Sequence, residues 1–215
     1  MDKESENRLV VSHLTLRKAI GYLGIALPLV LFFGGKLLFA LGMQSSISSY
    51  YHTAMRDVFV GILCSIGVFM AAYRGYERKD DIAGDLACLF AVGVAFFPTT
   101  PDNPTHHEKL IGTLHLIFTA LFFLTLSYFS LYLFRKTDPN KPPTRRKLKR
   151  NKIYRVCGYT MLGALALILL LGLLPNGAAA AIKKINPVFW LEVVAIEAFG
   201  VSWMTKGEAI LQDET

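Results

Sequence analysis

The sequence lacks the short motifs that mark many soluble enzyme classes. It has no glycine-rich phosphate loop and no Gly-x-Ser-x-Gly elbow, and His106-His107-Glu108 does not continue into a His-Glu-x-x-His pair. A P-loop nucleotidase, an α/β serine hydrolase and a zincin protease therefore find no support. Internal repeats and low-complexity segments are also absent, so residues 1–215 are expected to form one domain.

Cysteine and charge are both scarce. The three cysteines are odd in number, fall in apolar runs and form no Cys-x-x-Cys pair, so we expect no structural disulfide. Only 18% of the residues are charged, whereas 53% are hydrophobic and the mean hydropathy is +0.41. The apolar runs are continuous and do not alternate, which disfavours a β-barrel. The composition is typical of an all-α, polytopic membrane protein.

Six apolar runs are long enough, or nearly so, to cross a hydrocarbon core of about 30 Å at 1.5 Å per residue. Asn186-Pro187 is a typical start for the last of them, and no small-residue cleavage pattern follows the first, which we interpret as a retained span. The sequence therefore predicts a six-helix transmembrane bundle. The predicted spans are 19–41, 57–73, 82–97, 109–134, 154–174 and 188–204.

The distribution of cations predicts the orientation. The N-terminal tail, the 74–81 and 135–155 connections and the C-terminal tail together hold 18 lysines and arginines, whereas the opposite connections hold four. The positive-inside rule then places both termini in the cytoplasm, and the protein in the cell membrane as a multi-pass protein, the inner membrane if the source is bacterial. The basic run 141–152 is interpreted as a loop over anionic headgroups, and no nucleic-acid partner is expected. Trp190 and Trp203 are expected to be interfacial anchors.

Polar residues gather at the predicted non-cytoplasmic side. Ser48 and His52 are four residues apart, so they share a face if the helix continues, and Asp57 opens the next span. Hydroxyl, imidazole and carboxylate could converge on a metal or a water. The alternative is a carboxylate helix cap beside an interfacial histidine. His115 lies inside the fourth span, as a ligand or as a hydrogen-bonded link between helices.

Two glutamates interrupt the last span. Glu192 lies one turn from its outer end, and Glu197 lies near the middle of the membrane. A carboxylate there needs a partner or becomes protonated. One interpretation pairs a glutamate with Lys36, the lysine inside the first apolar run. The other makes Glu192 a metal ligand and Glu197 a general base or proton site.

The segment around Ser48-x-x-x-His52, followed by Asp57, resembles the CREST superfamily, which includes alkaline ceramidases, progestin and adipoQ receptors and hemolysin-III-like proteins. The resemblance implies a helical membrane fold, zinc bound by these residues and, in several members, hydrolysis of lipid amides. The match covers roughly ten residues. The last span departs from the family pattern, because Glu192 and Glu197 stand where the family has His-x-x-x-His.

Three functions follow as hypotheses. The first is a metal-dependent hydrolase of membrane lipid, with zinc held by His52, Asp57, His115 and Glu192 and with catalytic roles for Glu197 and Ser48. The second is an ion- or proton-coupled binding or transport protein that uses Lys36, Glu197 and His115. The third is a non-catalytic accessory subunit whose polar residues join helices. The expected partner is membrane lipid. Assembly into a homo-oligomer is a further alternative.

Overall fold

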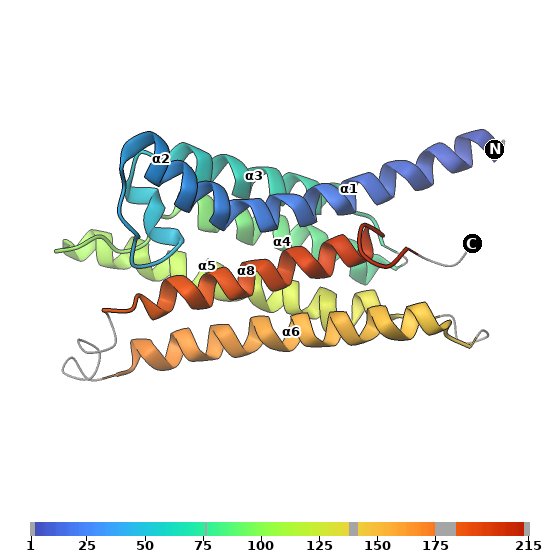
Figure 1. The fold of residues 1–215 in the computed structure, drawn as a ribbon. Helices are drawn as coiled ribbons and strands as arrows, with labels where there is room; N and C mark the ends of the chain where they lie inside the picture. Colours follow the sequence, from blue (N-terminus) through green and yellow to red (C-terminus); the bar gives the residue numbers. More distant parts are fainter. Residues whose placement is uncertain (1–2, 76, 138–141, 175–183, 213–215) are drawn as a thin grey trace.

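The computed structural model describes residues 3–75, 77–137, 142–174 and 184–212, with side chains from residue 13 onward. Within these residues the chain is helical without strands, which confirms the all-α prediction. The long helices lie side by side along one direction and form an elongated bundle (Figure 1). α1 begins and α8 ends at the same end of this bundle.

Each predicted span falls on one of six long helices of the described chain. The largest differences are at the starts of α1 and α6, which begin at Lys3 and Arg145 rather than at 19 and 154, because a polar run continues as helix ahead of each apolar segment. In α6 this extension begins behind the Thr144 cap. The helices are α1 (Lys3–Leu29), α3 (Arg56–Ala72), α4 (Arg78–Phe96), α5 (His106–Leu131), α6 (Arg145–Gly172) and α8 (Pro187–Lys206). The π-helical turn η1 (Val30–Gly34) and α2 (Gly35–Phe39) extend α1, and two 3-10 turns are η2 (Ser48–His52) and η3 (Leu133–Arg135).

Four helical segments are long and apolar enough to cross a membrane. They cover 13–39, 106–135, 145–172 and 187–206. Of the other two long helices, α3 has only 17 residues, and α4 carries charged residues in its first turns. The structure therefore supports a membrane-embedded helical protein.

Glycines set the close approach of α1 and α8. A Cβ at Gly200 would lie 2.5 Å from the Cγ1 of Ile25 and 3.0 Å from the Gly21 carbonyl oxygen. The first distance is shorter than real Cβ contacts and the second is tight, so a side chain at Gly200 would require the two helices to shift apart. Small residues commonly bring membrane helices together in this way. α8 also packs along α6, which places it between α1 and α6.

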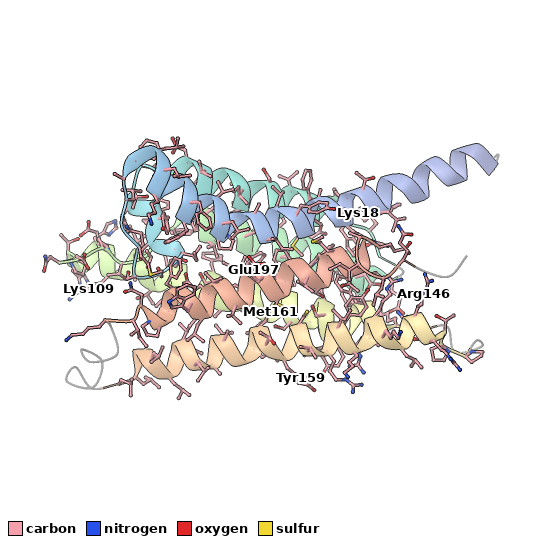
Figure 2. The ribbon with its side chains drawn as sticks, in the orientation of Figure 1. Lys18, Lys109, Arg146, Tyr159, Met161 and Glu197 are labelled. Carbon is pink, nitrogen blue, oxygen red and sulfur yellow. The ribbon has the colours of Figure 1, made fainter. Side chains whose placement is uncertain are left out.

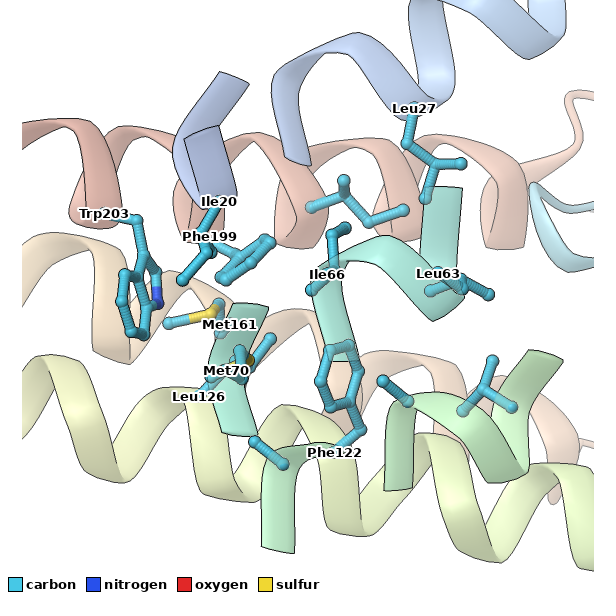
Figure 3. Close-up of a cluster of buried hydrophobic side chains, with 14 of the residues drawn as sticks. Ile20, Leu27, Leu63, Ile66, Met70, Phe122, Leu126, Met161, Phe199 and Trp203 are labelled. Carbon is cyan, nitrogen blue, oxygen red and sulfur yellow. The ribbon is translucent and has the colours of Figure 1, made fainter. Parts of the chain in front are cut away.

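Trp203 lies in the core of the bundle and not at the membrane interface, so its predicted role as an interfacial anchor is wrong. Its ring is fully buried, with the rings of Tyr73, Phe129 and Phe134 at centroid distances of 5.0–5.4 Å. Trp190, by contrast, is 53% exposed near the opposite end of α8. Figure 3 shows Trp203 beside Phe199 and Met161 in the buried cluster that fills the bundle.

The two ends of the bundle differ in their charges. Figure 2 shows Lys18 and Arg146 toward the end where α1 begins, and Lys109 toward the other end. We call the first the basic end. We call the second the serine end, because it carries the 40–55 connection with Ser48.

Candidate functional site

The 40–55 connection folds back across the serine end of the bundle (Figure 1). α2 stops at Ala40, whose left-handed backbone (φ 52°) turns the chain, and the Leu41 N–H donates to the Gly35 carbonyl at 3.1 Å. Ile47 and Tyr50 then insert into the bundle, where each is 1% exposed. Burial raises the pKa of the Tyr50 phenol. The connection is therefore packed into the bundle through these two side chains, and we call residues 40–55 the plug.

This plug brings Ser48 onto Glu192 of α8. The Ser48 N–H donates to one carboxylate oxygen at 3.1 Å, and the Ser48 hydroxyl donates to the other at 3.4 Å. Both residues are buried, at 8% and 9% exposure. No lysine, arginine or histidine of the described chain forms an ion pair with Glu192. A buried carboxyl group is thus held by uncharged donors alone, an arrangement that costs free energy unless a further donor or a proton reaches it.

An apolar cavity of about 40 Å³ extends from this pair into the bundle. By the same measure one water needs about 10–15 Å³, so the cavity is narrow. On α8 the lining runs from Glu192 to Phe199, seven residues or about 10 Å of helix. Figure 3 shows several of its apolar lining residues. They are Leu27, Leu63, Ile66, Phe122, Leu126 and Phe199.

Thr119 adds a third polar group to this cavity and was missed from the sequence. Its Oγ1 is buried and has no hydrogen-bond partner among the described residues, although Thr119 lines the cavity. Threonine hydroxyls in helices usually satisfy themselves on a carbonyl one turn earlier, as Thr125 does. The available signal was spacing, because Thr119 lies one turn after His115 on the same helix face.

The two histidines bind the connection between α4 and α5. The ring of His52 contacts the Thr99 carbonyl oxygen through Nε2 at 2.7 Å, and the ring of His115 contacts the Phe97 carbonyl oxygen through Nδ1 at 2.7 Å. His115 is 2% exposed, whereas His52 is exposed. In the structure, both rings therefore hold residues 97–99 against the bundle, as the helix-linking alternative for His115 expects.

The predicted zinc ligands do not form a cluster in the structure. Asp57 is exposed in the first turn of α3, where Met55 and not Asp57 is the N-cap. Within the described residues, no three histidine, cysteine, aspartate or glutamate side chains are grouped to hold a metal ion. Ser48 and Glu192 meet, but His52, Asp57 and His115 do not join them as ligands. As placed, these side chains do not fit the zinc site that the resemblance implies, and zinc binding stays a prediction.

Lys36 and Glu197 are not paired. Lys36 is exposed on α2, and Glu197 is half-buried about midway along α8 (Figure 2). Among the described residues, neither forms an ion pair, and Lys36, Glu197 and His115 make no hydrogen bonds to one another. The predicted ion pair is therefore wrong in this structure. An ion pair outside the site does form, between Arg74 and Asp85 at 3.3 Å.

Comparison with known proteins gives no match to a family model, a curated protein or a solved structure.

Proposed function

We propose that the chain is a six-span protein of the cell membrane with both termini in the cytoplasm. α3 and α4 pack on each other, and each packs on one of the membrane-length helices, α1 and α5 respectively. The 17 residues of α3 span about 25 Å, close to the hydrocarbon thickness of about 30 Å. The 18-to-4 division of cations supports the basic end as the cytoplasmic one.

Accessibility of introduced cysteines tests this orientation. Arg145→Cys, at the basic end, should resist an impermeant maleimide added to intact cells and react after permeabilisation. Lys109→Cys, at the serine end, is the matched control and should react without permeabilisation. The unsubstituted chain reports the background from its own three cysteines. Labelling of residue 145 in intact cells would reverse the orientation.

We further propose that the cavity binds a membrane amphiphile, with a slim alkyl chain in the cavity and a hydrogen-bond-donating head at Glu192. The observation that carries this proposal is a buried carboxyl group at the mouth of an apolar cavity, which no cation of the described residues pairs with. An amine, amide or hydroxyl head would give Glu192 a donor in addition to the two that Ser48 supplies. The Thr119 hydroxyl offers a second polar contact.

The width and lining of the cavity favour one chain rather than a ring system or a hydrated ion. A cavity of about 40 Å³ that extends about 10 Å along α8 is slender. Its walls are leucine, isoleucine, valine and phenylalanine, except for Ser48, Thr119 and Glu192. Methylene groups gain by leaving water for such walls, whereas an ion would lack ligands beyond the mouth. The function proposed is binding or presentation of a single-chain lipid.

Lipid retention tests the proposal. Protein purified in mild detergent is extracted, and the bound amphiphiles are identified by mass spectrometry. Glu192→Gln removes the charge-assisted contact and should lower retention by about 10-fold or more, because hydrogen bonds to charged groups contribute about 1.5–3 kcal/mol. Glu197→Gln is the matched control, since Glu197 does not line the cavity, and should retain ligand like the wild type. A wild type without stoichiometric amphiphile, or equal effects of the two variants, would overturn the proposal.

Lipid hydrolysis is the second candidate, and the histidine geometry is the observation that favours it. Imidazoles that bind a metal usually donate their other ring N–H to a backbone carbonyl or carboxylate, and His52 and His115 each contact a carbonyl in this way. Metal content therefore separates a lipid-binding protein from a zinc-dependent hydrolase.

A further inference from the structure

A second hollow lies on the outside of the bundle, between α4 and α5. It is a groove of about 500 Å³ that does not share a residue with the internal cavity. Its apolar wall includes Leu86 and Phe90 of α4 and Leu121 and Leu124 of α5. Three of these four side chains, the leucines, are 37–47% exposed, so the groove faces the surroundings of the bundle.

One end of the groove is cationic. Lys79, in the first turn of α4, lines it and is exposed, and it forms no ion pair with any residue that the structure describes. The neighbouring carboxylates are engaged elsewhere, Glu77 and Asp80 by Lys136 and Asp81 by the Gly75 N–H. Tyr128, whose ring is partly exposed, stands in the same groove near the basic end of α5. A lysine and a tyrosine at this position are typical of the headgroup level of a membrane.

The length of the groove matches one leaflet. From Lys79 to Phe90 the α4 helix advances eleven residues, or about 16 Å, and half of a hydrocarbon core of about 30 Å is about 15 Å. A lipid with its phosphate at Lys79 would therefore lay one acyl chain along the whole groove and end near the membrane centre. Because the groove has a cation at only one of its ends, that end is the one that would hold the lipid headgroup.

We propose that this groove is a binding site for an anionic phospholipid of the cytoplasmic leaflet, with its phosphate or glycerol headgroup at Lys79 and one acyl chain between α4 and α5. The inference rests on the proposed membrane orientation and is independent of the ligand in the internal cavity. Charge complementarity favours a lipid over a second copy of the chain, because the groove offers an uncompensated cation beside an apolar strip.

Native mass spectrometry of the detergent-solubilised chain, with phosphatidylglycerol or phosphatidylcholine added separately, tests the site. The wild type should bind one phosphatidylglycerol in preference to phosphatidylcholine. Lys79→Gln should reduce this preference about fivefold, the equivalent of ~1 kcal/mol for a lysine near an anionic headgroup. Lys152→Gln is the matched control, since Lys152 is an exposed cation of α6 away from the groove, and should keep the preference.

Thr125→Phe tests the acyl-chain half of the site. Thr125 lines the groove and lies outside the buried core, so a phenyl ring there should occupy the groove without disturbing the fold. Binding of both lipids at this site should fall, while retention of the internal ligand in the same spectra stays unchanged. The proposal is overturned if the wild type binds the two lipids equally or if Lys79→Gln behaves like Lys152→Gln. It is also overturned if Thr125→Phe converts a dimer into a monomer, which would make the groove a protein interface.

Discussion

The two ends of the bundle differ in whether their buried charged side chains contact a side chain of opposite charge. At the basic end, Asp80 is 1% exposed and accepts hydrogen bonds from Lys136 at 3.1 and 3.2 Å and from the Glu77 N–H at 2.8 Å. Arg150, 4% exposed, contacts the Tyr154 hydroxyl and the Glu208 carboxylate. At the serine end, the donors to Glu192 among the residues that the structure describes are both uncharged groups of Ser48.

This difference distinguishes charged residues that stabilise the fold from a charged residue that is available to bind a ligand. Charges that are matched inside the protein contribute to a fixed structure, and removing one partner is costly. A buried carboxyl group without a countercharge is poorly stabilised by the protein itself and gains from a ligand. The same chemical change, from carboxylate to amide, should therefore have different consequences at the two ends.

Asp80→Asn should be the most damaging of these changes, lowering the free energy of unfolding by about 2–3 kcal/mol. The amide still accepts the Glu77 N–H, but Lys136 loses the charge that holds it in a half-buried position. Chemical or thermal unfolding in detergent measures the effect. Asp85→Asn is the control, because its pair with Arg74 is 54–60% exposed and should contribute about 0.5 kcal/mol or less. Equal effects would show that burial does not make the pair of Asp80 more important for stability than the exposed pair of Asp85.

His115→Ala should lower the unfolding free energy by about 2 kcal/mol. It leaves the carbonyl of the half-buried Phe97 without its partner and opens a void beside α4. His52→Ala, at an exposed position, should cost less. Metal analysis of the same preparations tests the zinc prediction. Stoichiometric zinc in the wild type that disappears in both variants would favour the hydrolase, whereas a wild type free of zinc at micromolar supply would remove it.

Glu192→Gln should change stability by about 1 kcal/mol or less in either direction. The amide oxygen still accepts a hydrogen bond from Ser48, and the cost of holding a charge in the bundle disappears. Ligand retention should nevertheless fall, as proposed above. Unfolding and retention measured on one preparation separate the two roles. A loss of stability as large as that of Asp80→Asn would make Glu192 part of the scaffold.

Above neutral pH, the stability supplied by Lys136 should change only in alkaline solution. Burial alone would lower the pKa of Lys136, but the hydrogen bonds and charges of Asp80 and Glu77 outweigh it and raise that pKa. A raised folded-state pKa stabilises fully below the unfolded value of about 10.4 and ceases to do so as pH rises through the folded value. The difference in Tm between wild type and Lys136→Gln should thus be constant from about pH 7 to 9.5 and shrink above about pH 10.5. A difference that changes near neutrality would contradict this assignment.

Much of the fold was predictable because it follows from hydropathy. The apolar runs and the Asn186-Pro187 start place most helix ends within a few residues, except where a polar run continues a helix, as at Lys3 and Arg145. The aromatic content of α5 gave no sign of which rings face inward. Trp203 of α8 was misplaced because both a core and a membrane interface favour tryptophan.

The candidate site was only partly predictable. Ser48 and Glu192 were selected as polar residues at the right depth, but their contact depends on how the 40–55 connection folds back, which spacing does not encode. His52 and His115 were selected for side-chain chemistry, and their partners turned out to be backbone carbonyls of 97–99. Every residue carries a carbonyl, so the sequence offers no signal for such contacts.

Lys36→Met should have the smallest effect, with a Tm that does not differ measurably from the wild type. The sequence favoured a buried pair with a glutamate, whose loss would be costly, but Lys36 is exposed on α2 and pairs with neither Glu192 nor Glu197 in the described structure. Near the serine end, the flexible side chain of Lys36 can place its ammonium group among the headgroups, so its replacement by methionine should cost little stability. Thermal unfolding of Lys36→Met beside Glu197→Gln measures this. A clear loss in the single variant that the double variant restores would re-establish the pair, and would extend matched charge to the end of the bundle that otherwise lacks it.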